Sequence, residues 1–285
     1  MRFGLDVPTT GAFADPRALA QLATDAEAAG WDGFFLWDVL HGGSPAAPEP
    51  VADPWIALTA ITLRTTRLRL GLFVCPLARH RPWLVARRLA ILDQLSGGRV
   101  TCAVGLGANQ RDFSAFGEAS APDVRARKLD EGLAILAGLW TEDAFSFSGQ
   151  HYSLDAVTLH PRPLQSPRIP LWVAGGWPRR APFRRAARWD GVCLKSRHTG
   201  RHEPLTVDDF RACLAYVQAQ RHSAAPFDIV MSGESPSDPR QADAYVRPFA
   251  SAGATWWIEE GLGWSFDEFR ARILAGPPRP ADTLA

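Results

Sequence analysis

A carboxylate and an imidazole follow the second apolar run of the chain and are its first candidates for chemistry. Asp38 comes directly after Trp37, and His41 lies three residues further on. A carboxylate there can act as a base or orient a cofactor edge, and an imidazole can transfer protons near neutral pH. The sequence therefore predicts Asp38 and His41 as catalytic residues. The structural alternatives are a loop-capping Asp38 and a surface His41.

Small residues follow the fourth and fifth apolar runs. Gly175 and Gly176 stand between a run that ends at Ala174 and a helical pattern that begins beyond Trp177. Glycines between a strand and a helix let backbone N–H groups approach a phosphate, and the helix dipole adds attraction. We therefore expect a phosphate-bearing ligand at these four residues. The segment after the fourth run adds three candidate ligand contacts: Gly105, Gly107 and Asn109.

The third apolar run ends without a titratable or metal-ligating side chain at its rim. Leu72, Phe73, Val74 and Cys75 are followed by Pro76. An apolar backbone shelf suits a flat hydrophobic ring better than a charged sugar phosphate, so we expect the first four residues to contact such a ring. The alternative is a core strand that ends at an ordinary loop.

Metal chemistry finds no support in the sequence. It contains no His-x-His pair on a strand and no tight cluster of His, Asp and Glu, so no metal site is predicted. The cysteines, Cys75, Cys102, Cys193 and Cys213, form no CxxC pair, and we expect buried, reduced thiols.

Eight short apolar runs, each followed by a loop and a helical pattern, position these residues. The runs are Phe3–Val7, Gly33–Trp37, Leu68–Val74, Arg99–Val104, Ile169–Ala174, Asp190–Leu194, Phe227–Met231 and Ala254–Ile258. Continuous apolar runs are typical of parallel strands that helices cover. The pattern predicts an α/β fold, a (β/α)₈ TIM barrel, whose chemistry lies at the C-terminal ends of the strands.

Helix signals agree with this interpretation. Asp15-Pro16, Asp53-Pro54 and Asp238-Pro239 each offer an N-cap followed by proline, and Ser265–Glu268 and Thr206–Asp209 have capping-box spacing. Gly30 and Gly253 fall where helices must end.

The sequence predicts a single domain over residues 1–285. We expect extended loops after strand four (Gly105–Asp123), after helix four (Thr141–Arg168) and after strand six (Lys195–Leu205). The second of these contains a candidate hairpin between Phe145 and Leu154.

Composition excludes several classes of partner. The net charge is +1, which argues against nucleic acid or an anionic membrane as a partner. An acidic residue at position 6 argues against a signal peptide, and no apolar run approaches the ~18 residues of a membrane span. We therefore expect a cytoplasmic protein that acts on a small molecule.

Four stretches carry a resemblance to a known family. They are Gly33–Asp38, Arg79–Trp83 with Leu92–Gly107, Arg127–Trp140, and Pro161–Pro163 with Gly175-Gly176. With these stretches the chain resembles the bacterial luciferase-like superfamily of barrel oxidoreductases over roughly its whole length.

The resemblance implies a cofactor, either FMN or the deazaflavin F420, and an activity as a monooxygenase or as a reductase or dehydrogenase. The ring would lie against Leu72–Cys75, with a cis peptide at Leu72–Phe73. The phosphate would lie near Ala174–Gly176, and Asp38 near the reactive edge of the ring. A homodimer is also implied.

The chain departs from the family pattern at two places. Val39 stands where relatives commonly have a histidine, which leaves open whether His41 replaces it. Ala108 and Asn109 stand where F420-dependent relatives can carry a glutamate. Two other functions stay open: a flavin-binding barrel without catalysis, and a phosphate-binding barrel lyase or hydrolase.

Overall fold

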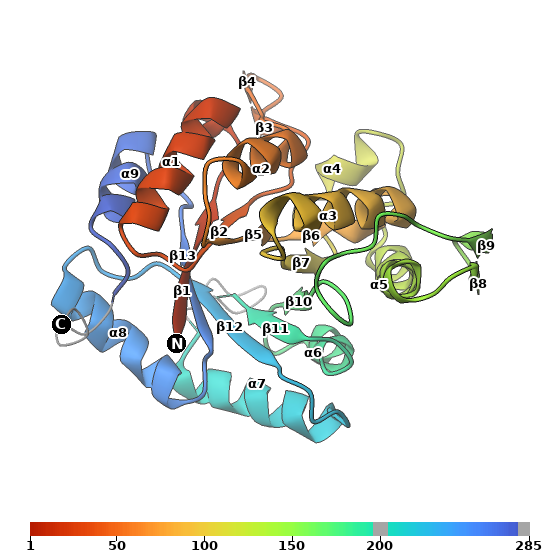
Figure 1. The fold of residues 1–285 in the computed structure, drawn as a ribbon. Helices are drawn as coiled ribbons and strands as arrows, with labels where there is room; N and C mark the ends of the chain where they lie inside the picture. The colour runs from red at the N-terminus through yellow and green to blue at the C-terminus, as the bar shows by residue number, and fades with distance from the viewer. Residues whose placement is uncertain (196–204, 279–285) are drawn as a thin grey trace.

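The computed structural model describes residues 1–195 and 205–278, and its centre is a sheet of nine parallel strands rolled into a nearly closed barrel (Figure 1). The strands of the barrel are β1 (Arg2–Val7), β2 (Gly33–Leu36), β5 (Arg69–Leu72), β6 (Cys75–Pro76), β7 (Cys102–Gly105), β10 (Leu171–Gly175), β11 (Gly191–Leu194), β12 (Asp228–Gly233) and β13 (Trp256–Glu260). Each of the eight predicted runs contains a strand, so the predicted barrel is confirmed.

The ninth strand is β6, which is divided from β5 and begins directly after the third predicted run. The sheet order is β5-β2-β1-β13-β12-β11-β10-β7-β6, so β5 and β6 lie at opposite edges of the sheet although only two residues separate them. A parallel bridge between Leu70 and Val100 joins the edges, and the Thr101 N–H donates to the Leu70 carbonyl at 2.9 Å.

The division falls at a cis peptide between Phe73 and Val74. The predicted position, Leu72–Phe73, is wrong by one residue. Phe73 still donates its N–H to the Leu36 carbonyl at 2.9 Å, so the chain leaves the β2–β5 ladder only after Phe73.

Helices surround the barrel (Figure 1). They are α1 (Pro16–Ala28), α2 (Pro54–Thr62), α3 (Pro82–Ser96), α4 (Arg111–Ser114), α5 (Pro122–Thr141), α6 (Arg180–Ala186), α7 (Val207–Gln220), α8 (Pro239–Ser251) and α9 (Phe266–Leu274), with short 3₁₀ turns η1 (Gly11–Phe13) and η2 (Leu77–Arg79). The predicted caps form: Asp15, Asp53 and Asp238 accept backbone N–H groups, and Thr206 and Ser265 make full capping boxes. No helix in the described part of the chain is long and apolar enough to span a bilayer.

The connections hold two hairpins. β3 (Gly42–Ser44) pairs with β4 (Ala47–Glu49) after β2, and β8 (Phe145–Ser148) pairs with β9 (Ser153–Val157) after α5. The second is the hairpin expected from the sequence, and it projects from the body of the protein (Figure 1). The loop after strand four contains α4. Most of the predicted loop after strand six, residues 196–204, lies outside the described residues.

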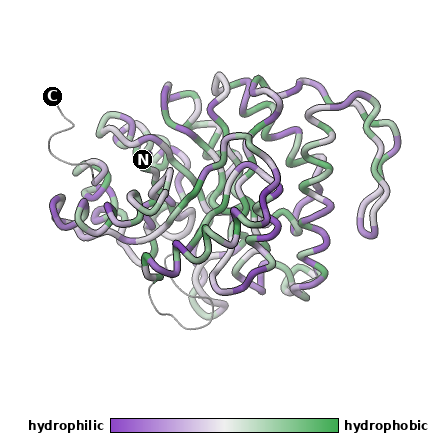
Figure 2. The backbone as a smooth tube through the Cα atoms, turned by 90° about the horizontal axis from the view of Figure 1, so that it is seen from below, coloured by the Kyte–Doolittle hydropathy of each residue, from purple (hydrophilic) through white to green (hydrophobic). Residues whose placement is uncertain are grey.

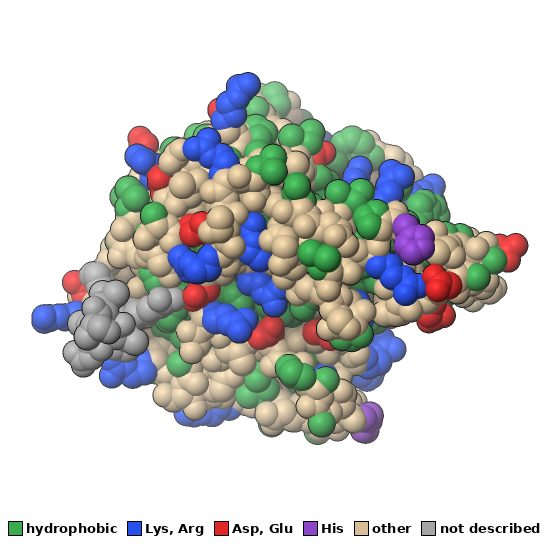
Figure 3. Space-filling model, in the orientation of Figure 1, with side chains coloured by type: hydrophobic (Ala, Val, Ile, Leu, Met, Phe, Trp, Pro, Cys, Tyr) green, Lys and Arg blue, Asp and Glu red, His purple; other side chains and the backbone are tan. Residues whose placement is uncertain are grey.

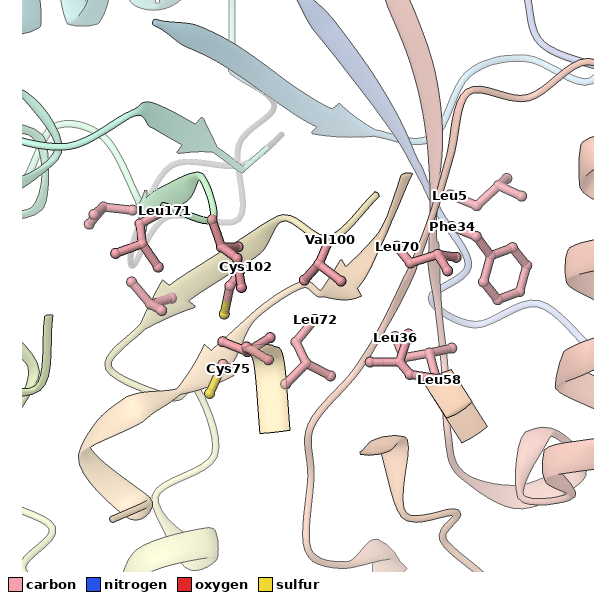
Figure 4. Close-up of a cluster of buried hydrophobic side chains, with 14 of the residues drawn as sticks. Leu5, Phe34, Leu36, Leu58, Leu70, Leu72, Cys75, Val100, Cys102 and Leu171 are labelled. Carbon is pink, nitrogen blue, oxygen red and sulfur yellow. The ribbon is translucent and has the colours of Figure 1, made fainter. Parts of the chain in front are cut away.

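Apolar side chains fill two layers. The larger lies between strands and helices, and Figure 4 shows part of it, including Leu36, Leu70 and Leu72. The smaller lies inside the barrel, where Phe35, Trp172 and Trp256 contact one another with ring centroids 5.5–6.1 Å apart. These rings close the barrel from within and form a floor. Along the helices, hydrophobic and hydrophilic residues alternate, as an inner and an outer face require (Figure 2).

Candidate active site

The residues predicted to hold a ring and those predicted to hold a phosphate meet at the C-terminal mouth of the barrel. Val74 and Ala174 both pack against the inner cluster. A Cβ built on Gly105 would lie 3.2 Å from Val74 Cγ2 and 3.7 Å from Ala174 Cβ. The segment just after β5 and the ends of β7 and β10 therefore lie against one another at the mouth.

The four shelf residues contribute to the mouth in different ways. Leu72 and Cys75 are fully buried and belong to the outer layer (Figure 4). The Cys75 sulfur lies within 4.8 Å of ligand atoms of Asp38 and His80. Phe73, which is 3% exposed, lies in the inner cluster, and half-buried Val74 packs on it.

A side chain at either of two mouth glycines, Gly175 or Gly107, would clash with neighbouring groups. A Cβ on Gly175 would lie 2.5 Å from Pro182 Cβ, so a side chain there would displace the start of α6. Gly107 has a positive φ of 81°, and a Cβ there would lie 2.8 Å from the Phe113 ring. Half-buried Trp177 contacts the Phe183 ring at 5.7 Å, which fixes it beside Gly176.

Asp38 is held by two basic side chains. Its carboxylate, in a residue only 7% exposed, lies 2.7 Å from His80 Nε2 and also contacts the Arg79 guanidinium. Arg79 donates in addition to the Asp38 carbonyl at 3.1 Å and to Asp112 at 3.0 Å. The end of β2 and the η2 turn together fix the orientation of this carboxylate.

His41 contacts a different acid. Its Nε2 lies 3.3 Å from Asp112 Oδ1 and 3.3 Å from Asn109 Nδ2. The contact with Asp38 is made instead by His80, which the sequence interpretation did not select. The only signal for His80 was its place in the Arg79–Trp83 stretch of the family resemblance.

His80 carries a perturbed imidazole. Burial alone would lower the pKa of His80, but the neighbouring Cys75 sulfur and the hydrogen bond to Asp38 outweigh it and raise this pKa to about 10. Asp38, Cys75 and His80 each offer a ligand atom within 4.8 Å of the others. Because Asp38 and His80 bind each other and Arg79 binds Asp38, we assign no metal to this group.

Replacing His80 by glutamine tests its charge. The folded pKa of about 10 exceeds the ordinary 6.5, so protonated His80 stabilises the fold fully below pH 6.5 and progressively less as pH rises toward 10. We expect H80Q to lose about 1–3 kcal/mol of unfolding free energy at pH 6 and much less at pH 10. Chemical denaturation at both pH values measures this. An equal loss of unfolding free energy at pH 6 and pH 10 would show that the charge of His80 does not stabilise the fold. The exposed control H222Q should not show the pH-dependent loss, and finding it there would also contradict the role given to His80.

A second buried carboxylate, Asp6, lies at the same mouth. It is 3% exposed, its Oδ1 has no partner among the described residues, and its backbone pairs in register with Glu260. Burial raises the pKa of Asp6 well above its ordinary value; Glu260 adds to this and Lys195 opposes it. Ser232 donates to Glu260 at 2.5 Å, and a side-chain hydrogen bond from Trp37 to Asp6 opposes the rise of the Asp6 pKa. The sequence interpretation did not select Asp6.

Comparison with known proteins shows the family of the chain. A family model described as luciferase-like monooxygenase matches residues 1–254. The chain belongs to this family. It is 26% identical, over 311 aligned positions, to the F420-dependent glucose-6-phosphate dehydrogenase of Amycolatopsis mediterranei (strain U-32), covering 89% of this chain and 91% of that protein.

Solved structures share the fold of this luciferase-like protein. Monooxygenase RslO1 from Streptomyces bottropensis superposes with a TM-score of 0.76 at 22% identity, over 96% of each chain. The F420-dependent tetrahydromethanopterin reductase of Methanopyrus kandleri superposes with a TM-score of 0.74 at 15% identity, over 96% of this chain and 97% of that one.

These findings confirm the family, the fold class, the oxidoreductase class and the expectation of FMN or F420, since relatives of both cofactor types are found. The roles of individual residues in this luciferase-like protein, Asp38 and His41 included, stay predictions.

Proposed function

We propose that this protein binds FMN or F420 at the C-terminal mouth of its barrel and oxidises or reduces a small organic substrate there. The observation that carries the proposal is the contact of Val74, Gly105 and Ala174, which brings the apolar shelf and the glycine pair to one space. When bound, the cofactor ring would supply the redox chemistry, and the protein would position it.

The residues present fit such a group. Glycine at position 105 lets Val74 approach the end of β7 closely, and Phe73 with its neighbours offers an apolar backbone for one face of a flat ring. Gly175 and Gly176 leave the backbone open to a phosphate. Asp6 Oδ1, near the C-terminal end of β1, is a buried polar atom without a hydrogen-bond partner among the described residues, and a ligand at the mouth would satisfy it.

Asp38 and Asp6 have different proposed roles. Arg79 and His80 hold Asp38 in one orientation, so its carboxylate is suited to positioning rather than to proton exchange. Asp6 is buried and its pKa is raised, so we propose Asp6 as the group that holds or gives a proton to the substrate. His41, bound to Asp112 and Asn109, would orient the loop above the site.

Titration of the purified protein with FMN and with F420, following ring absorbance, tests the proposal. We expect one of the two to bind with one site per chain and to undergo a substrate- or oxygen-linked redox change. Binding without any redox change would favour the non-catalytic barrel. Binding of inorganic phosphate but of neither ring would favour a lyase or hydrolase.

We further propose a cytoplasmic homodimer. The four cysteines in the structure are buried and free, as in a reducing compartment. α2 packs against α3, and exposed apolar side chains lie on these helices or directly after them. Ile56 in α2 and Leu63 just after it are 64% and 69% exposed, and Ile91 and Leu95 in α3 are 47% and 44% exposed. A monomer rarely leaves such residues together in water.

Light scattering measures the oligomeric state. We expect a dimer for the wild-type protein and a monomer for I56E, since a carboxylate placed between two apolar faces would be desolvated. The control L274E changes an equally apolar, 53% exposed side chain on α9 and should remain dimeric. A wild-type monomer would overturn the proposal.

A further inference from the structure

A pocket lined by four arginines lies at the opposite end of the barrel, where the strands begin. It measures about 350 Å³ and is lined by Arg2, Asp32, Arg67, Arg69, Gly98 and Arg99. Arg2 and Arg69 are the first residues of β1 and β5. Figure 3 views this end, and basic side chains gather near the middle of the face with a few acidic ones between them.

Neutral groups fix three of these guanidinium groups. Arg67 donates to the carbonyls of Trp31 (3.2 Å) and Glu27 (2.6 Å), Arg69 to Gln165 Oε1 (2.9 Å), and Arg99 to the carbonyls of Leu68 (2.9 Å) and Thr65 (2.8 Å). Carbonyl oxygens orient a guanidinium without cancelling its charge. Among the described residues, none of the four arginines forms an ion pair with a carboxylate.

Arg2 is the least constrained of the four. Its guanidinium lies over the Trp256 ring, 5.4 Å from the centroid, and makes no hydrogen bond within the described part of the chain. Arg69 is its neighbour: burial and then the charge of Arg2 lower the pKa of Arg69. Two like charges with free donors face the same pocket, and an anion between them would relieve their repulsion.

Four carboxylates lie near the pocket, and each already accepts donors. Glu27, whose charge acts on Arg99, accepts the N–H groups of Thr66, Arg67 and Leu68 at 2.7–3.0 Å. Asp32 accepts the Phe3 N–H at 2.8 Å, Asp228 accepts from Trp172 Nε1 and Thr255 Oγ1 at 3.1 Å each, and buried Asp93 accepts the N–H groups of Leu164 and Gln165 at 2.9 and 3.0 Å. These acids offset part of the positive potential. The pocket therefore favours a multiply charged anion, which gains from several guanidinium groups at once, over a singly charged one.

We propose that this pocket binds a small polyanion that carries phosphate groups, with Arg2 and Arg69 as its direct contacts and Arg67 and Arg99 at the rim. Guanidinium groups match phosphate oxygens in pairs of parallel hydrogen bonds. The site lies at the far end of the barrel from the candidate active site, so it goes beyond the proposed function and does not depend on it.

Calorimetric titration with inorganic pyrophosphate tests the proposal. We expect binding to the wild-type protein that weakens as salt is added, and about tenfold weaker binding to R2Q, which loses one charge-assisted contact. R69Q should show the same loss and serves as a second variant if R2Q folds poorly. R17Q, which removes an exposed arginine from the first turn of α1, should bind like the wild type.

Two results would overturn the proposal. One is no binding of pyrophosphate to the wild-type protein. The other is equal binding to wild type, R2Q and R69Q, which would place the anion elsewhere, for example at Gly175 and Gly176. Titration of R2Q with FMN and F420 separates the two sites, since that variant should keep the cofactor affinity of the wild type.

Discussion

Replacing Gly105 by leucine is expected to weaken cofactor binding about 10- to 100-fold, because overpacking a filled space costs about 1–3 kcal/mol. The new side chain would begin 3.2 Å from Val74 Cγ2 and 3.7 Å from Ala174 Cβ and extend into the space between them. A ring bound there would have to share that space. Absorbance titration with FMN and F420 measures the effect.

The matched control is G105A. It adds only the Cβ, which the neighbouring Val74 side chain can accommodate by a small shift, so binding should change little. Thermal unfolding of both variants shows whether the barrel is intact. If G105L folds and binds the cofactor with wild-type affinity, the ring does not occupy this part of the mouth.

Replacing Asp6 by asparagine is expected to lower activity and raise stability together. A proton-transferring side chain contributes about 10²–10⁴-fold to a reaction, so kcat should fall at least about 100-fold. Burial raises the folded-state pKa of Asp6, so the unfolded chain ionises this carboxyl first as pH rises. Asp6 therefore lowers stability above its ordinary pKa of about 4, and D6N should stabilise the protein at pH 7 by about 1–2 kcal/mol.

The paired measurements are kcat at saturating substrate and the unfolding free energy at pH 7. D228N is the control, because Asp228 is also inside the barrel but at the opposite end; it should leave kcat unchanged and lose stability with its hydrogen bonds to Trp172 and Thr255. Unchanged kcat in D6N would remove Asp6 from the chemistry, and a loss of stability would show that its carboxyl is well satisfied.

The barrel could be predicted because its signals are local. Parallel strands buried on both sides are continuous apolar runs, and a helix start at Asp53-Pro54 needs only neighbouring residues. The break in the third run could not be seen, since no polar or charged residue stands in Leu70–Val74, where strand β5 ends. The short α4 helix and the β3–β4 hairpin were missed because segments of three or four residues carry no periodicity.

Some candidate site residues could be selected for the same reason. Ala174–Trp177 and Leu72–Cys75 each lie across the end of an apolar run. The partner of Asp38 could not, since His80 is 42 residues away and reaches it only through the fold of the η2 turn. Asp6 was missed because an acid near the end of a strand looks like the start of a loop. Its burial depends on the closed barrel around it, which residue order does not reveal.

A structure of the protein with its bound cofactor tests the central claim most directly. The ring should lie flat against the backbone of Leu72–Cys75, its phosphate should contact Gly175 and Gly176, and the carboxyl group of Asp6 should face the substrate side of the mouth. Two results would contradict the central claim. One is a ring bound away from Phe73 and Val74, and the other is a ring on the shelf whose phosphate binds apart from Gly175 and Gly176.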